Sequence, residues 1–113
     1  MSIASDLIRG NTDMIILAHL LKGDSYGYNI NKSILSRTNG LFELKEATLY
    51  SAVKRLEEAG MITSYWGDEN TGARRRYYSI TLDGRQLFLS MRKEWENAVE
   101  LIDLLIEEDS YEG

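Results

Sequence analysis

The spacing of hydrophobic and polar residues predicts four helices, with a pair of strands between the third and the fourth. The first helix is expected between Thr12 and Gly23, where apolar residues occupy nearly every side. Such a helix has to be covered on several sides, so we expect it to be the central helix of the core. Thr12 is expected to cap its start. The only histidine, His19, lies among apolar neighbours on this helix, which favours a partly buried structural role.

The second and third helices are separated by a clear stop signal. The second is predicted from about Tyr26 to Thr38, with Asp24 or Ser25 as its N-cap. Asn39-Gly40 is expected to end it, because glycine readily adopts the left-handed backbone found at helix ends. The third helix is predicted from Glu46 to Ala59, directly before another glycine.

The third helix has two different faces. At 100° per residue its apolar residues fall on one side, which we expect to face the core: Leu49, Ala52, Val53 and Leu56. The opposite side is small and hydroxylated near the start and basic further along, so it can approach DNA closely. Its residues are candidate DNA contacts, with Ala47, Thr48 and Ser51 beside base edges and Tyr50, Lys54 and Arg55 on phosphates.

The segment after the third helix is predicted to form a β-hairpin. Its strands are expected at Met61 to Trp66 and at Arg74 to Thr81, on either side of a polar loop at residues 67–72. Neighbouring residues of a strand point to opposite faces, so a run of three arginines places at least one on each face. Arg74, Arg75 and Arg76 are candidate phosphate contacts. The alternative is a solvated charge cluster that protects the edge of the sheet.

Three helices followed by a basic hairpin is the order of a winged helix-turn-helix. In that fold the third helix enters the major groove and the hairpin lies along the DNA backbone. We therefore expect a mainly α fold with a small β-hairpin and a C-terminal dimerisation helix. Residues 1–81 are expected to form the DNA-binding domain, and residues 82–113 the dimerisation helix and an acidic tail.

Three stretches of the chain form a specific set of motifs: Glu46-Ala-Thr-Leu-Tyr-Ser-Ala-Val-Lys-Arg-Leu-Glu-Glu-Ala-Gly-Met-Ile62, Ser64-Tyr-Trp-Gly-Asp68, and Arg74-Arg-Arg-Tyr-Tyr-Ser-Ile-Thr81 with Gly84. They resemble the PadR family of bacterial transcriptional regulators. Gly23 and Tyr26-Gly27-Tyr28 fit as well, so the resemblance covers about residues 10–106. It implies a DNA-binding repressor.

The last helix is predicted from near Asp83 to about Glu108. It carries apolar residues spaced 3, 4, 3, 4 and 3 apart, as in a coiled-coil seam: Phe88, Met91, Trp95, Ala98, Ile102 and Leu105. Further apolar residues widen the stripe, so we expect the helix to contact both its own domain and a second subunit. In the PadR family this region resembles the dimerisation helix. The alternative is a helix that only folds back on its own domain.

Trp95 has two competing interpretations. It either fills the seam as ordinary packing or, with its symmetry mate, sandwiches a planar aromatic molecule. The resemblance to multidrug-sensing PadR-like repressors implies the second, with planar drugs as ligands. The other expected lining residues are Met91, Ala98, Val99 and Met14. The carboxylate of Glu96 or Glu100 is expected to pair with a cationic ligand.

The net charge of −5 hides an uneven distribution. Residues 1–93 hold all 13 basic residues and 10 acidic ones, whereas residues 94–113 hold eight acidic residues and no basic one. Because the local potential decides phosphate binding, an acidic chain does not exclude DNA. The acidic tail is either a solvated helix face or an interaction arm.

The composition removes several classes of function. There is no cysteine and a single histidine, so disulfides, zinc fingers and His-rich metal sites are excluded, and we expect no cofactor and no enzyme activity. No apolar run reaches the roughly 18 residues that span a membrane, and no secretory signal is recognised, so we expect a cytoplasmic protein.

The leading hypothesis is therefore a homodimeric repressor that binds a dyad-symmetric site in double-stranded DNA and responds to a ligand. The alternatives are a winged-helix module that binds proteins and a constitutive DNA binder without ligand control.

Overall fold

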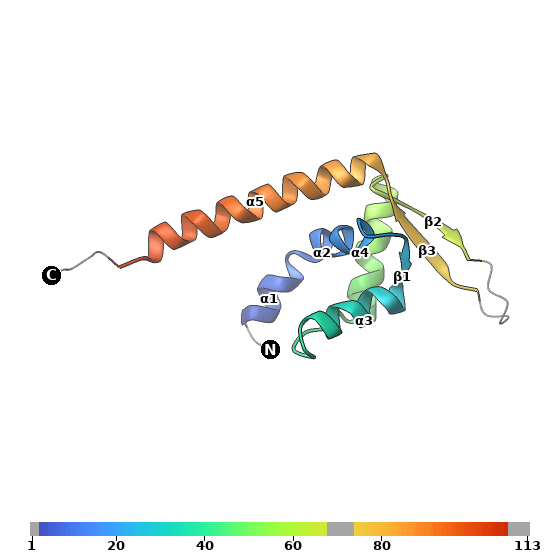
Figure 1. Cartoon of the computed structure of the whole chain (residues 1–113), viewed down its shortest axis with the longest axis horizontal. Helices are drawn as coiled ribbons and strands as arrows, with labels where there is room; N and C mark the ends of the chain where they lie inside the picture. Colours follow the sequence, from blue (N-terminus) through green and yellow to red (C-terminus); the bar gives the residue numbers. More distant parts are fainter. Residues whose placement is uncertain (1–2, 68–73, 109–113) are drawn as a thin grey trace.

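The computed structural model describes residues 3–67 and 74–108 of the chain. Within these residues the elements are α1 (Ile3–Arg9), α2 (Thr12–Leu20), β1 (Ser25–Tyr26), α3 (Gly27–Arg37), α4 (Glu46–Glu58), β2 (Ile62–Trp66), β3 (Arg76–Ile80) and α5 (Leu82–Ile106). Figure 1 shows α2, α3 and α4 gathered in one body, from which the β2–β3 hairpin and the long helix α5 extend in different directions. The expected mainly α fold with a small hairpin is confirmed.

Helix α2 lies at the centre of the core, as its apolar pattern predicts. Ile16, Leu17 and Leu20 have at most 1% of their surface exposed. The helix contacts α4, α5 and β3, so three elements pack around it. Side chains from each of them complete the core, including Leu49, Ala52, Val53, Leu56, Tyr78 and Phe88.

The start of α2 differs from the prediction. Asn11 is the N-cap residue, and no side chain caps the helix. Thr12 is instead the first residue of α2, and its hydroxyl donates a hydrogen bond of 2.7 Å to the carbonyl oxygen of Arg9. The cause is α1, a short helix that the sequence pattern did not reveal and that ends just before α2. Its last turn supplies the acceptor for the threonine hydroxyl.

The three strands form one antiparallel sheet in the order β1-β3-β2. The predicted hairpin is present, with Trp66 opposite Arg76 and Tyr65 opposite Tyr77. Strand β1 was not predicted, because a two-residue strand leaves no alternating pattern to detect.

Strand β1 also explains why the predicted caps of α3 were wrong. Neither Asp24 nor Ser25 caps this helix; its N-cap residue is Tyr26, whose extended backbone belongs to the strand. Ser25 is buried, and its hydroxyl accepts a hydrogen bond of 3.0 Å from the side-chain amide of Asn29. Ser25 pairs with Tyr78 of the central strand, so this residue belongs to the sheet and not to the start of the helix.

His19 is partly buried, as expected. Its Nε2 lies 3.1 Å from the hydroxyl oxygen of Ser25, so the ring links α2 to the sheet. Burial lowers the pKa of His19, and the nearby charges of Lys22 and Arg37 lower the pKa further. These contacts fit a structural histidine.

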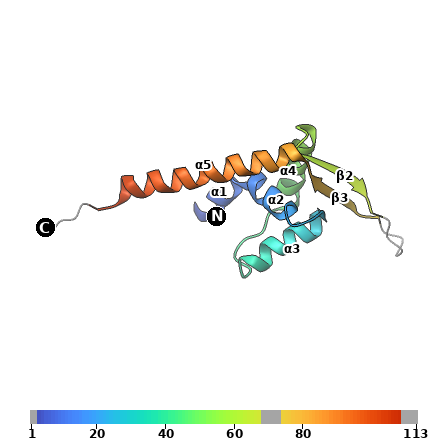
Figure 2. The ribbon, with the colours of Figure 1, turned by 45° about the horizontal axis from the view of Figure 1, so that its top comes forward.

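Helix α5 reaches well beyond the rest of the molecule. The described structure measures 69 × 30 × 21 Å along its principal axes, and both ribbon views show α5 along the longest one (Figures 1 and 2). Phe88 belongs to the core and Met91 is partly buried against it, but every described residue from Arg92 to Glu108 is exposed. None of the described helices combines the length and the apolar character needed to cross a membrane.

The first turn of α5 fits tightly against the segment between α4 and β2. The hydroxyl of Thr81 caps the helix by accepting a hydrogen bond of 3.0 Å from the amide of Gly84, and it donates one of 2.8 Å to the carbonyl of Gly60. A Cβ at position 84 would overlap the carbonyl oxygen of Met61 and would lie 2.8 Å from Cγ1 of Ile80. Gly84 therefore permits a close approach of two backbone segments.

We predict that Gly84→Ala destabilises the fold by roughly 1–3 kcal/mol, because the colliding atom belongs to backbone that cannot rotate away. Urea unfolding at fixed protein concentration, followed by circular dichroism, measures the loss. Ser90→Ala, at an exposed position of the same helix, is the control. Equal stability of Gly84→Ala and the wild type would contradict the tight fit.

Candidate nucleic-acid interface

The loop before α4 is fixed by one side chain of α3. Asn31 donates a hydrogen bond of 2.7 Å to the carbonyl of Leu44 and accepts one of 3.0 Å from the amide of the same residue. The two hydrogen bonds tie the loop before α4 to helix α3. Phe42 and Leu44, both in this loop, are buried.

Helix α4 presents the two faces that its sequence predicts. The predicted core residues each have at most 2% of their surface exposed. On the opposite face Ala47, Ser51, Lys54 and Arg55 are exposed and Thr48 is partly buried. Tyr50 is 46% exposed on the flank. The small residues line a shallow hollow of about 340 Å³ that also reaches Arg9 and Arg55.

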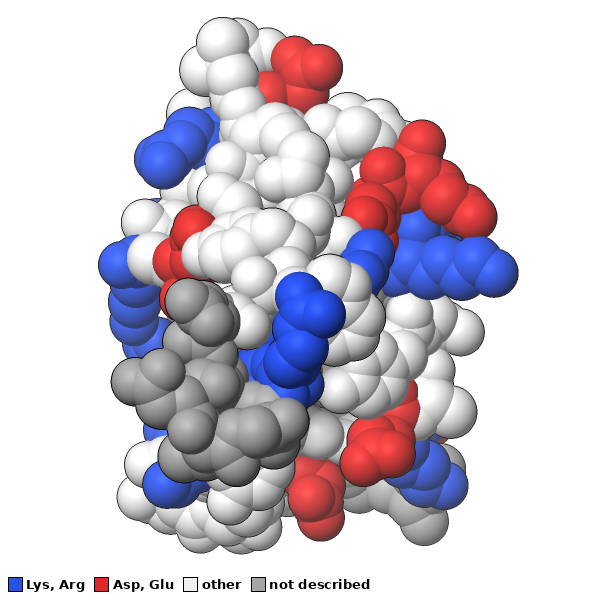
Figure 3. Space-filling model, turned by 90° about the vertical axis from the view of Figure 1, so that its right-hand side faces the viewer, with Lys and Arg blue, Asp and Glu red and all other residues white. Residues whose placement is uncertain are grey.

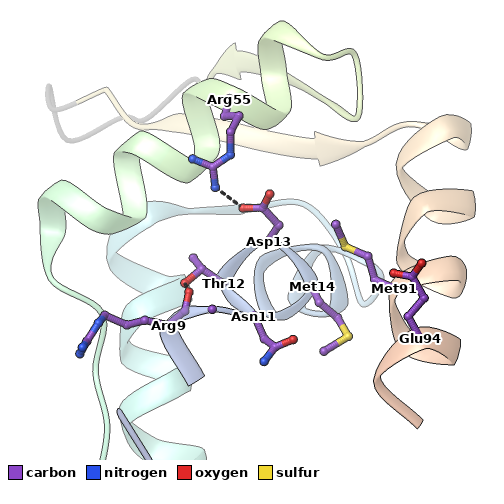
Figure 4. A pocket seen from close by; sticks show the side chains of 9 residues that line it. Arg9, Asn11, Thr12, Asp13, Met14, Arg55, Met91 and Glu94 are labelled. Carbon is purple, nitrogen blue, oxygen red and sulfur yellow. Dashed lines mark hydrogen bonds and ion pairs between the residues drawn. The ribbon is translucent and has the colours of Figure 1, made fainter. Parts of the chain in front are cut away.

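Arg55 already has an intramolecular partner. Its guanidinium forms an ion pair of 2.5 Å with Asp13 at the start of α2, and both side chains retain access to solvent (Figure 4). The ion pair therefore ties the exposed face of α4 to the central helix. Lys54 has no ion pair among the described residues.

The three arginines before and within β3 divide between the two faces of the hairpin, as predicted. Arg74 and Arg76 each lie 5.2 Å from the centre of the Trp66 ring, whereas Arg75 lies 4.7 Å from the centre of the Tyr26 ring. Arg76 also approaches Glu57 of α4 at 3.7 Å. Cation–π contacts of this kind hold the arginines against the sheet while leaving them exposed.

A cavity of about 290 Å³ lies where the hairpin meets α3 and α4. We call the hairpin β2–β3 the wing and this space the wing-root cavity. It brings Tyr50 of α4 and all three arginines together with residues that the sequence analysis gave no role: Tyr26, Gly27, Tyr28 and Tyr78. Burial raises the pKa of the Tyr78 hydroxyl, and Tyr50 raises that pKa as well, so these two hydroxyls lie within electrostatic reach of each other.

The charge at this end of the molecule is mixed. Figure 3 looks along the long axis onto the wing end, and lysine and arginine side chains are interspersed there with acidic ones. An anion is therefore attracted by local groups of arginines, rather than by a uniformly basic face.

The comparison with known proteins identifies the family. Residues 16–89 match the model of the transcriptional regulator PadR-like family, which is more than half of the chain. The chain belongs to the PadR-like family. It is therefore a DNA-binding transcriptional regulator and not an enzyme, as the sequence motifs indicated.

Individual relatives are similar to this PadR-like regulator over most of their length. A transcriptional regulator from Clostridium thermocellum is 46% identical, with a TM-score of 0.85 over 94% of this chain and 100% of that chain. A PadR family transcription regulator from Clostridium difficile is 34% identical, with a TM-score of 0.73 over 86% and 99% of the two chains. An uncharacterized protein of Lysinibacillus sphaericus is 46% identical over 105 residues, which are 93% of this chain and 96% of that one.

The residues expected at a ligand site of this PadR-like regulator lie in two separate places of the single chain. Met14 and Met91 line a cavity of about 270 Å³ between α2 and α5, together with Asp13, Arg55 and Glu94 (Figure 4). Glu96, Val99 and Glu100 instead border an open groove along the outer half of α5. Trp95 and Ala98 are exposed on that half. A single chain therefore does not bring Trp95 and Met14 into one cavity.

Glu94 and Asp13 were not among the predicted ligand residues. Both lie at polar positions whose neighbours in space come from another helix, so the sequence gives no signal for them. No group of three or more acidic or histidine side chains that could hold a metal ion occurs within the residues that the structure describes.

Proposed function

We propose that this PadR-like regulator is a homodimeric repressor whose α4 helices and wings bind a dyad-symmetric DNA site. Ala47, Thr48 and Ser51 are proposed to lie beside base edges, and the basic residues and Tyr50 on phosphates. The wing-root cavity is the observation that carries this proposal. It joins Tyr50 of the reading helix to Arg74, Arg75 and Arg76, so that one DNA strand passing this point meets both elements.

The division after residue 81 into a DNA-binding domain and a dimerisation helix is part of the proposal. Exposed apolar residues on the outer half of α5 support it: Ile102 is 54% exposed and Leu105 is 82% exposed. Burying such residues in a second copy is favourable by about 25 cal/mol for each Å² of apolar surface. Because Phe88 already packs in its own core and Met91 partly does, we place the interface mainly at Trp95, Ala98, Ile102 and Leu105.

The ligand site is proposed to form only in the dimer. Trp95 is 44% exposed in the single chain, and a second copy related by a two-fold axis would place another tryptophan ring opposite it. Met14 and Met91 are proposed to line the pocket with Ala98 and Val99, while Glu96 and Glu100 favour a cation. A ligand relieves repression only if it prefers one separation of the two α4 helices.

The DNA-binding proposal predicts a steep dependence on salt. If the dimer neutralises 6 to 10 phosphates, affinity for a duplex selected from a random pool should fall roughly 10³- to 10⁵-fold between 50 and 200 mM salt. Arg74→Gln with Arg75→Gln removes four charges per dimer, and each phosphate that is no longer neutralised by an arginine lowers the slope by about 0.9. Fluorescence anisotropy at several salt concentrations measures both values.

The control for the wing variant is Arg85→Gln with Lys93→Gln, which removes the same charge from exposed positions of α5. It should leave the slope near that of the wild type. An unchanged slope in the Arg74 and Arg75 variant would show that the wing makes no phosphate contact. No binding of the wild type to any duplex would overturn the proposed function.

The dimer proposal predicts that Ile102→Glu with Leu105→Glu yields monomers, because each substitution would bury an uncompensated charge at the interface. Sedimentation velocity measures the change. Ser90→Glu with Asn97→Glu adds the same charge on exposed polar positions away from the seam and should remain dimeric. A dimer that persists in the first variant would place the interface elsewhere.

The ligand proposal predicts that proflavine, a planar cation, quenches the fluorescence of Trp95. Trp95→Ala should weaken proflavine binding about tenfold or more, since two stacked faces are lost per site. Trp66→Phe keeps Trp95 as the only tryptophan and should bind normally. If a dimeric Trp95→Ala protein bound proflavine with undiminished affinity, Trp95 would not be a ligand-binding residue, and its role would be ordinary packing.

A further inference from the structure

Gly27 is buried at the first residue of α3, directly beneath the side chain of Tyr50. A Cβ at position 27 would lie 2.8 Å from Cζ of Tyr50 and closer still to its hydroxyl oxygen. The backbone does not need glycine here, because the glycines with positive φ are Gly23, Gly40 and Gly60. Gly27 therefore matters for the space that it leaves open.

Tyr50 fills that space and so reaches the wing-root cavity. Its ring crosses from α4 to the start of α3, and its hydroxyl comes within electrostatic reach of Tyr78 on the central strand. The arginines of the wing line the same cavity. The space left by the missing side chain of Gly27 thus sets the distance between the Tyr50 hydroxyl and the wing arginines.

We propose that Gly27 is a positioning residue for DNA binding, which seats Tyr50 so that its hydroxyl and the wing arginines meet the same stretch of DNA backbone. This inference rests on the proposed DNA-binding function. It adds the requirement that the Tyr50 ring lies against Gly27 when DNA is bound. Gly27 itself contacts no DNA in this arrangement; it acts through Tyr50.

The effect of a larger residue at position 27 depends on whether the neighbouring Tyr50 side chain can move. The atoms in the way are the far end of an exposed side chain, which can rotate towards solvent, whereas Gly84 faces backbone. Alanine also favours a helix more than glycine does. Gly27→Ala should therefore displace Tyr50 and leave the fold intact.

The test is a double-mutant cycle on the full-length dimer. The dissociation constant of a duplex selected by the wild type is measured for the wild type, Gly27→Ala, Tyr50→Ala and the double variant. Gly27→Ala should weaken binding about tenfold, the order expected from losing a charge-assisted hydrogen bond to phosphate. In the Tyr50→Ala background the same substitution should change affinity less than about twofold, because nothing remains to be displaced.

Two further readouts separate positioning from a general structural effect. The melting temperature of Gly27→Ala should match that of the wild type. The dependence of affinity on salt should also stay unchanged, because a tyrosine hydroxyl carries no charge, whereas the arginine variant of the wing flattens it. Gly10→Ala is the matched glycine control, since a Cβ there comes no nearer than 3.4 Å to its neighbours and should not affect affinity.

The outcomes are distinguishable. Wild-type affinity in Gly27→Ala, or equal losses with and without Tyr50, would overturn the role of Gly27 while leaving the proposed function in place. A wild-type protein that binds no duplex would overturn both.

Discussion

Because α2 has apolar side chains on nearly every side, α4, α5 and β3 have to pack on it together. Ile16, Leu17 and Leu20 have almost no exposed surface, and each lost contact in such a core is costly. The arrangement places the core face of α4 inward and its small and basic residues outward. It also fixes the base of the wing, because β3 packs on the same helix. The geometry of the proposed DNA-binding surface therefore depends on α2, although α2 lies behind the exposed face of α4.

Helix α5 belongs to two environments along its length. Its first turns are held by Gly84 against Met61 and by Phe88 in the core, so the start of the helix moves with the winged-helix body. Its outer half carries apolar residues that no other part of the described structure covers. If the outer half of α5 forms the proposed interface, one continuous helix joins that interface to the core, and a change at the interface would alter the position of α4. This is how a ligand between two subunits would alter the separation of the reading helices.

The sequence predicts elements well where long periodic segments exist. The apolar face of α4 and the glycine that follows it are both strong signals. The predicted start of α4 therefore agrees with the structure, and its predicted end is only one residue too late. Strand β1 and helix α1 are too short to produce a periodic pattern, and the caps that depend on them were therefore wrong. The predicted wing arginines and Tyr50 do meet in one cavity. The contribution of Tyr28 and Gly27 to that cavity could not be predicted, because it depends on how α3 crosses α4.

Several of the exposed cations of this surface already have an intramolecular partner. Arg55 is paired with Asp13, Arg76 approaches Glu57, and Arg75 lies over Tyr26. In each contact the arginine side chain is exposed to solvent. Such surface contacts are worth about 1 kcal/mol or less, so a DNA phosphate can replace them at small cost. The replaced carboxylates then face the DNA backbone and reduce the net gain. The number of phosphates neutralised, and with it the salt dependence, should therefore be smaller than a count of basic residues on this surface suggests.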